Sequence, residues 1–234
     1  MPASRGVRNV VAMRNRVARL LAVAIAVALT ACGSSSGRSG IVSTATSTGG
    51  SAHHAAACHP PGTRTLAAAG AARVFAAGTS VYACSERTGR RTYLGQTRSC
   101  IRTPRIGVLA AAGDLAAYAL QLCGIDTGRA QVIVRRLTDG RQVLSAPAFT
   151  GALGPESYTT VDALVLRADG GLAWIASGSS VVRPTRNREV HRRQHAGPSL
   201  LDAGVHIAPA SLRLRGASQV SWTDGGTART ATLR

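Results

Sequence analysis

The stretch LVLRADGGLAWIAS, residues 164–177, contains the pattern that decides the fold of this chain. An apolar run is followed by a turn with Asp169 and two glycines, and then by a second apolar run that contains Trp174. Apolar runs on either side of an Asp-Gly turn are typical of a β-hairpin. We therefore predict an antiparallel hairpin with the tryptophan on its second strand.

Three other segments share this plan: residues 73–86 (RVFAAGTSVYACSE), 107–121 (GVLAAAGDLAAYALQ) and 212–225 (LRLRGASQVSWTDG). In each, the second strand contains an aromatic residue at the matching place, namely Tyr82, Tyr118 and Trp222. With Trp174 included, successive aromatic residues are 36, 56 and 48 residues apart. A β-meander that recurs about every 40–50 residues is typical of propeller blades.

A fifth hairpin is predicted in residues 131–145, where QVIVRRLTDGRQVLS places the two-residue turn signal Asp139-Gly140 between two strands. We therefore expect an all-β domain over residues 58–234, built as a propeller-like array of about four antiparallel β-meander units. The recurring aromatic residues would fill the cores between units. Four units is small for a closed propeller, so an open curled meander or a β-sandwich is the alternative.

The first 31 residues are predicted to be a lipoprotein signal peptide. Five arginines without an acidic residue precede the apolar run LLAVAIAVAL, residues 20–29, whose length suits a signal peptide and is too short to span a bilayer. The run ends in Leu29, Thr30, Ala31 and Cys32, which resembles the lipobox of bacterial lipoproteins. That resemblance implies cleavage before Cys32, a diacylglycerol on its thiol and an acylated amino terminus.

Residues 32–57 are predicted to be the lipidated cysteine followed by a flexible Ser/Gly/Ala linker, because almost nothing in them can build a core. A linker of this length spans about 25–30 Å root-mean-square. The lipobox and the β repeats together resemble the irregular propeller-like lipoproteins of bacteria, although the G-H…W-D pair of one propeller subfamily is missing. The expected location is extracytoplasmic, with a lipid anchor in the cell membrane.

The formal net charge of +18 comes from arginine alone, since the chain has no lysine. This excludes a Walker A lysine, a Schiff-base lysine and an S-x-x-K acyl-enzyme motif. The densest positive segment contains Arg183, Arg186, Arg188, Arg192 and Arg193. We interpret it as a solvated loop between strands and as a candidate contact for anionic lipid or an anionic wall polymer, because guanidinium groups bind phosphate and carboxylate. No nucleic-acid partner is expected.

Four cysteines remain after Cys32, and an even number in an exported domain predicts two disulfides. We favour Cys58–Cys84 with Cys100–Cys123, which would pin the linker end to the first hairpin and join two neighbouring units. The main alternative pairs Cys84 with Cys123 and Cys58 with Cys100.

Two histidine groups are candidate metal ligands. His53, His54 and His59 surround Cys58, but two of them fall in the predicted linker and the cysteine is expected to be oxidised. His191 and His195 are four residues apart, in a segment that we interpret as a loop without a catalytic glutamate between them. We therefore predict no metal and no cofactor.

The sequence favours a binding or scaffolding module at the cell surface over an enzyme, because no catalytic constellation stands out. One alternative is an extracytoplasmic hydrolase of a wall or glycan substrate, with loops of the repeat domain forming its pocket. Another is a solute-binding lipoprotein, for which a two-lobed α/β fold and a βαβ pattern would be expected.

Overall fold

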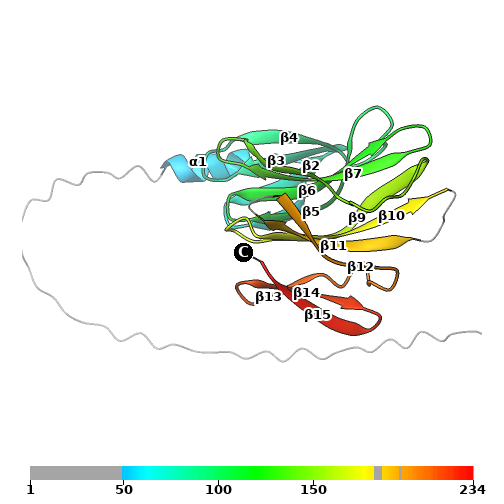
Figure 1. The fold of residues 1–234 in the computed structure, drawn as a ribbon. Helices are drawn as coiled ribbons and strands as arrows, with labels where there is room; N and C mark the ends of the chain where they lie inside the picture. The colour runs from blue at the N-terminus through cyan, green and yellow to red at the C-terminus, as the bar shows by residue number, and fades with distance from the viewer. Residues whose placement is uncertain (1–48, 182–185, 195–196, 234) are drawn as a thin grey trace, which may run out of the picture. The chain divides into compact units, whose positions relative to one another are not determined.

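The computed structural model describes residues 49–181, 186–194 and 197–233, which all belong to one compact unit, Thr46–Arg234. These residues form one short helix, α1 (Gly49–Ala57), and fifteen β-strands (Figure 1). The predicted all-β class is therefore confirmed. The predicted signal peptide, Cys32 and residues 33–48 lie outside the described residues. Within the described part of the chain, no helix is long and apolar enough to cross a membrane.

Twelve strands form three consecutive four-stranded antiparallel meanders. The first comprises β1 (Arg64–Ala69), β2 (Ala72–Ala77), β3 (Ser80–Ser85) and β4 (Arg91–Gln96). The second comprises β5 (Arg105–Ala112), β6 (Leu115–Cys123), β7 (Gly128–Arg136) and β8 (Gln142–Pro147). The third comprises β9 (Ser157–Leu166), β10 (Leu172–Ser180), β11 (Asn187–Gln194) and β12 (Gly197–Gly204).

Single parallel bridges join these meanders into one mixed sheet. Gln96 on β4 pairs with Arg105 on β5, and Gly128 on β7 pairs with Tyr158 on β9. A separate three-stranded sheet follows, made of β13 (Arg213–Arg215), β14 (Gln219–Asp224) and β15 (Thr227–Thr232). The large sheet is mixed and does not close into a barrel.

All five predicted hairpins are present, as β2–β3, β5–β6, β7–β8, β9–β10 and β13–β14. The two-residue turn predicted for Asp139-Gly140 is wrong in length. The connection runs from residue 137 to residue 141, and the Arg136 N–H donates to the Arg141 carbonyl at 2.8 Å. Asp139 closes this longer turn by accepting the Arg141 N–H at 2.9 Å, and Gly140 takes the positive φ of 74° that the turn needs.

The core consists of layers that lie between consecutive sheets. Tyr118 is buried with residues of the first two meanders, Trp174 with residues of the second and third, and Trp222 with residues of the third meander and the last sheet. The predicted core role is confirmed for these three aromatic residues. Tyr82 differs, because no meander precedes its own within the described residues: it stacks on Phe75, with ring centroids 5.7 Å apart, beside the Cys58–Cys84 disulfide.

The favoured disulfide pairing is the one in the structure. Cys58 is bonded to Cys84 on β3, with Cα atoms 5.5 Å apart. Cys100, in the β4–β5 connection, is bonded to Cys123 at the end of β6, with Cα atoms 5.2 Å apart. The first bond fixes the segment before β1 to the first meander, and the second joins the first meander to the second.

The predicted linker is too long, since its last nine residues form α1. Alanine is the strongest helix former, but a nine-residue helix is marginal in water without tertiary contacts. Those contacts come from the β3–β4 turn, where the His54 Nδ1 lies 2.7 Å from the Arg87 carbonyl and Gly89 packs against His54 and Ala57. The disulfide at Cys58 then holds the end of the helix in place.

Candidate functional site

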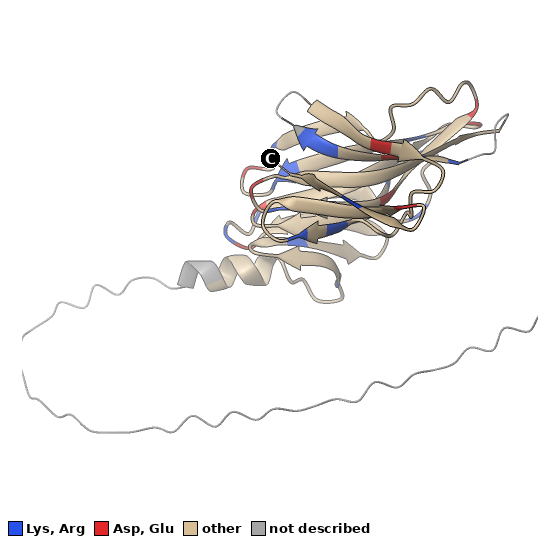
Figure 2. Cartoon of the chain, turned by 60° about the horizontal axis from the view of Figure 1, so that its bottom comes forward, with Lys and Arg blue, Asp and Glu red and all other residues tan. Residues whose placement is uncertain are grey.

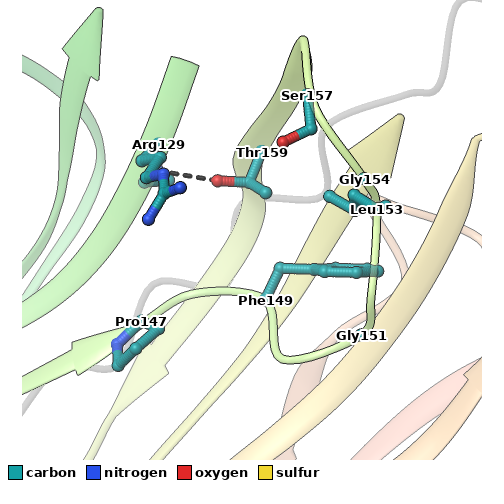
Figure 3. Close-up of a pocket in the computed structure, with 9 residues that line it drawn as sticks. Arg129, Pro147, Phe149, Gly151, Leu153, Gly154, Ser157 and Thr159 are labelled. Carbon is teal, nitrogen blue, oxygen red and sulfur yellow. Dashed lines mark hydrogen bonds between the residues drawn. The ribbon is translucent and has the colours of Figure 1, made fainter. Parts of the chain in front are cut away.

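A pocket of about 250 Å³ lies at the end of the second meander, where the β8–β9 connection crosses toward the third. Figure 3 shows Arg129 and Pro147 on one side of it and Phe149 with the rest of the connection on the other. Its lining residues are Arg129, Ala130, Pro147, Phe149, Gly151, Leu153, Gly154, Ser157 and Thr159. The pocket therefore combines one guanidinium, two hydroxyls and an aromatic ring.

The polar groups of the pocket are available to a ligand. Among the described residues, neither the exposed Arg129 guanidinium nor the Ser157 hydroxyl has a hydrogen-bond or ion-pair partner. The Thr159 hydroxyl accepts the Ala130 N–H at 2.8 Å, shown as a dashed line in Figure 3, which leaves its own proton to donate. A guanidinium beside two hydroxyl donors suits a carboxylate or phosphate oxygen.

Phe149 forms the apolar wall, and two glycines make room for it. A Cβ added at Gly178 on β10 would come within 2.8 Å of the Phe149 ring, and one added at Gly151 would meet the same ring at 2.8 Å. The ring therefore lies directly on the backbone of β10. No larger residue fits at either glycine without moving the wall of the pocket.

Hydrogen bonds to the buried side chains of Trp174 and Glu189 hold the chain on both sides of Phe149. Trp174 Nε1 donates to the Ala148 carbonyl at 2.8 Å. Glu189 Oε2 accepts the Thr150 N–H at 2.7 Å and the Thr150 hydroxyl at 3.1 Å. The wall of the pocket is thereby fixed to β10 and β11 of the third meander.

Glu189 is itself part of a buried pair with His191. Its Oε2 lies 2.7 Å from His191 Nε2, and the two side chains are only 6% and 1% exposed. Burial by itself would raise the pKa of Glu189, but hydrogen bonds from His191 and Thr150 and the electrostatic attraction of His191 hold that pKa below its ordinary value. The imidazole stacks on Trp174 with ring centroids 5.1 Å apart, and its Nδ1 has no partner in the described part of the chain. Trp174, His191 and Glu189 thus form one buried support behind the pocket.

The structure does not gather the predicted arginine cluster into a solvated loop. Arg183 lies outside the described residues, and Arg186 is exposed ahead of β11. Arg188, Arg192 and Arg193 lie on β11 itself, which contradicts the loop prediction. The interpretation failed because this segment pairs on both edges, with β10 and with β12, so its backbone is held in the sheet despite its charge.

Two of these arginines are engaged by the protein. Arg188 Nη1 donates to the Val205 carbonyl at 3.0 Å, and its Nε lies 3.8 Å from Asp162, which also accepts the Ser177 hydroxyl. Arg192 Nη1 donates to the Thr232 carbonyl at 2.6 Å. Figure 2 shows basic positions spread over several strands and turns. Two of the five arginines are thus engaged by protein groups, and the joint anion contact stays a prediction.

The first histidine group is used by the fold. Cys58 is in a disulfide, His54 contacts the Arg87 carbonyl, and His59 Nε2 lies 2.8 Å from Glu86 Oε1. His195 lies outside the described residues, so the pair with His191 is untested. Within the described ranges, no three His, Cys, Asp or Glu side chains are placed to hold a metal ion.

Sequence reasoning missed the residues that form the pocket. Arg129 stands alone in a strand, and Phe149 lies in a connection with no motif. One signal was available: Phe149 is one of only two phenylalanines in the chain, and it is followed by two glycines within five residues. No protein-family model matches this sequence, and a comparison with curated proteins likewise gives no match.

Proposed function

We propose that this chain is an exported lipoprotein whose β domain is a propeller-like binding module, and that its pocket receives a small carboxylate ligand with an apolar group. The observation that carries the proposal is a preformed pocket whose guanidinium has no protein partner in the described part of the chain. Small-ligand sites usually combine apolar walls with a few such polar groups.

Export is supported by the two disulfides, which indicate an oxidising, extracytoplasmic environment. The lipobox at Leu29–Cys32 adds the proposed membrane anchor. Acylation of Cys32 would keep the binding module at the cell surface, where its ligand would be a wall component or a small solute.

The propeller-like arrangement is supported by the way the sheets pack. Each of the three core layers lies between one sheet and the next, and the aromatic residue of the later sheet fills it. Blades of a propeller bury their faces against neighbours in this manner. The pocket then lies where one blade passes to the next.

Replacing Cys32 with alanine tests the anchor. We expect the wild-type protein in the membrane fraction, labelled by fatty acid, and the variant either unprocessed or released to the soluble fraction. Cell fractionation with metabolic palmitate labelling measures both. A Cys58→Ala variant, which still has the lipobox, should keep its label. A Cys32→Ala protein that is still cleaved after Ala31 and stays on the membrane would contradict the lipoprotein assignment.

Replacing Arg129 with glutamine tests the pocket, with benzoate as a probe that has both a carboxylate and a ring. Because hydrogen bonds to charged groups contribute about 1.5–3 kcal/mol, we expect roughly a tenfold or greater loss of benzoate affinity. Chemical-shift titration of the labelled protein gives the affinity and the residues that respond. Arg98→Gln, an equally charged change outside the pocket, should leave the affinity unchanged. Equal affinity in the Arg129 variant would exclude this pocket as the carboxylate site.

A further inference from the structure

The β4–β5 and β6–β7 connections, together with the strand ends next to them, form a surface outside the pocket that we call the disulfide tip, residues 97–105 and 122–127. The Cys100–Cys123 bond joins them, and the Cys123 N–H donates to the Cys100 carbonyl at 3.2 Å. The tip begins where β4 ends, whereas α1 contacts Arg87 just before β4 begins. The tip and α1 therefore lie at opposite ends of the first meander (Figure 1).

Two large aliphatic side chains of the tip project into water. Ile125 is 97% exposed and Ile101 is 75% exposed, the highest values among the exposed large apolar residues of the described chain. The Gly124 N–H donates to the Thr127 carbonyl at 2.8 Å, so Ile125 sits at the centre of a closed turn. Ile101 directly follows Cys100 and Ile125 comes two residues after Cys123, so the disulfide holds the segments of both exposed side chains together, and apolar side chains gathered on an exposed surface mark interaction sites.

The same tip is basic. Arg98 and Arg102 in its first segment and Arg105 at the start of β5 are exposed, and Asp126 is the one acidic residue of the tip. Exposed isoleucines with exposed arginines near them in the sequence match the boundary of an anionic bilayer, where apolar groups enter the acyl region and cations stay at the phosphates. A protein partner would need an acidic apolar surface of its own, whereas an anionic membrane offers both features everywhere.

We propose that the disulfide tip docks on an anionic phospholipid surface, with Ile101 and Ile125 inserted and the three arginines at the lipid phosphates. The disulfide holds both connections together, so the two isoleucines enter as one preformed unit. The segment between a lipidated Cys32 and α1 is long enough to let the tip reach the membrane, a point that rests on the proposed lipidation of Cys32. The sixteen residues 33–48 can reach about 50 Å when extended, well beyond the roughly 20 Å length of a six-residue strand.

The test uses residues 33–234, which contain the whole compact unit, secreted with both disulfides formed and without an acyl chain. We expect this protein to sediment with vesicles of phosphatidylcholine and phosphatidylglycerol, and much less with phosphatidylcholine alone. Ile101→Ser with Ile125→Ser should lower the partition coefficient at least tenfold, since each buried CH₂ contributes about fourfold. Arg98→Gln with Arg102→Gln should lower it about fivefold per arginine at low salt.

Matched controls separate the tip from general effects of charge and exposure. Leu200→Ser removes another exposed aliphatic side chain, on β12, and should change nothing. Arg91→Gln with Arg141→Gln removes two exposed charges at the end near α1 and should cost far less than the tip pair. If the control arginines matter as much as the tip arginines, binding is by net charge alone and the proposal is wrong.

Insertion has its own readout. An Ile125→Trp variant should be quenched by brominated lipids, while Trp174 and Trp222, which are buried, should not be. Absence of wild-type vesicle binding, or no quenching of the new tryptophan, would overturn the proposal. A protein partner would then be the alternative for the tip. Because the tested protein lacks the anchor, failure here leaves the Cys32 proposal intact, and failure of acylation leaves tip docking intact.

Discussion

Replacing Trp174 with alanine will lower the free energy of unfolding by about 3–5 kcal/mol, the usual range for removing a large aromatic side chain from a core. The side chain is fully buried between the second and third meanders. It also stacks on His191 and donates a hydrogen bond to the Ala148 carbonyl. Alanine would leave a cavity, an unpaired carbonyl and a buried imidazole without its stacking partner. Urea unfolding followed by circular dichroism measures the loss.

Two further variants divide this loss into its parts. Trp174→Phe keeps most of the ring volume but removes the indole N–H, so its cost should be about 1–3 kcal/mol, that of one unsatisfied buried carbonyl with slight underpacking. Leu200→Ala changes a half-exposed residue and should stay within about 0.5 kcal/mol. A Trp174→Ala protein as stable as the Leu200→Ala protein would show that this layer does not hold the third meander on the second.

The position of Trp174 could be predicted because the information is local. A hairpin needs two apolar runs and a turn, and all five hairpins were found from such patterns. The recurrence of an aromatic residue on the second strand then indicated which side chain would fill a layer. Cysteine pairing followed from the same repeats, since each bond joins segments that the hairpins bring together.

Other features depend on contacts that are distant in the sequence. The charge density of the segment RNREVHRRQ, residues 186–194, predicts a loop, yet most of it is β11. Asp162 and the carbonyls of Val205 and Thr232 accept its arginines, and none of these partners can be identified without the fold. The same holds for α1, whose last turn depends on the β3–β4 turn about thirty residues later.

The pocket was unpredictable for the same physical reason. Arg129 and Thr159 belong to different meanders. They line the same pocket because β7 and β9 pair at Gly128 and Tyr158, next to the bond between the Ala130 N–H and the Thr159 hydroxyl. Phe149 takes its position from glycines on its own connection and on β10. The order of residues along the chain does not show which of these residues lie close together in the fold.

Replacing Glu189 with alanine will lower the free energy of unfolding by about 3–5 kcal/mol, the usual cost of removing one partner of a buried ion pair. The ring of the buried His191 loses its partner, and the N–H and hydroxyl of the exposed Thr150 lose an acceptor that water can replace. Glu189→Gln keeps the shape and one acceptor oxygen, so it should cost less. The Thr150 amide, measured by hydrogen exchange, should lose protection in both variants and most in the alanine variant.

The cost of Glu189→Gln should depend on pH, with a sign fixed by the lowered pKa of this carboxyl. Hydrogen bonds from His191 and Thr150 favour the ionised form in the folded protein despite burial, which by itself would raise the pKa. A carboxyl whose pKa is lower in the folded than in the unfolded state contributes stability above its unfolded pKa of about 4.3, and loses it as the pH falls through the folded value. The stability difference between wild type and Glu189→Gln should therefore be largest near neutral pH and shrink steadily below about pH 4.3.

Urea unfolding at a series of pH values measures the difference directly, with Asp126→Asn, an exposed carboxyl of the disulfide tip, as the control that should show little change. A difference that stays constant from neutral to acid pH would mean that the Glu189 carboxyl is not held ionised behind the pocket.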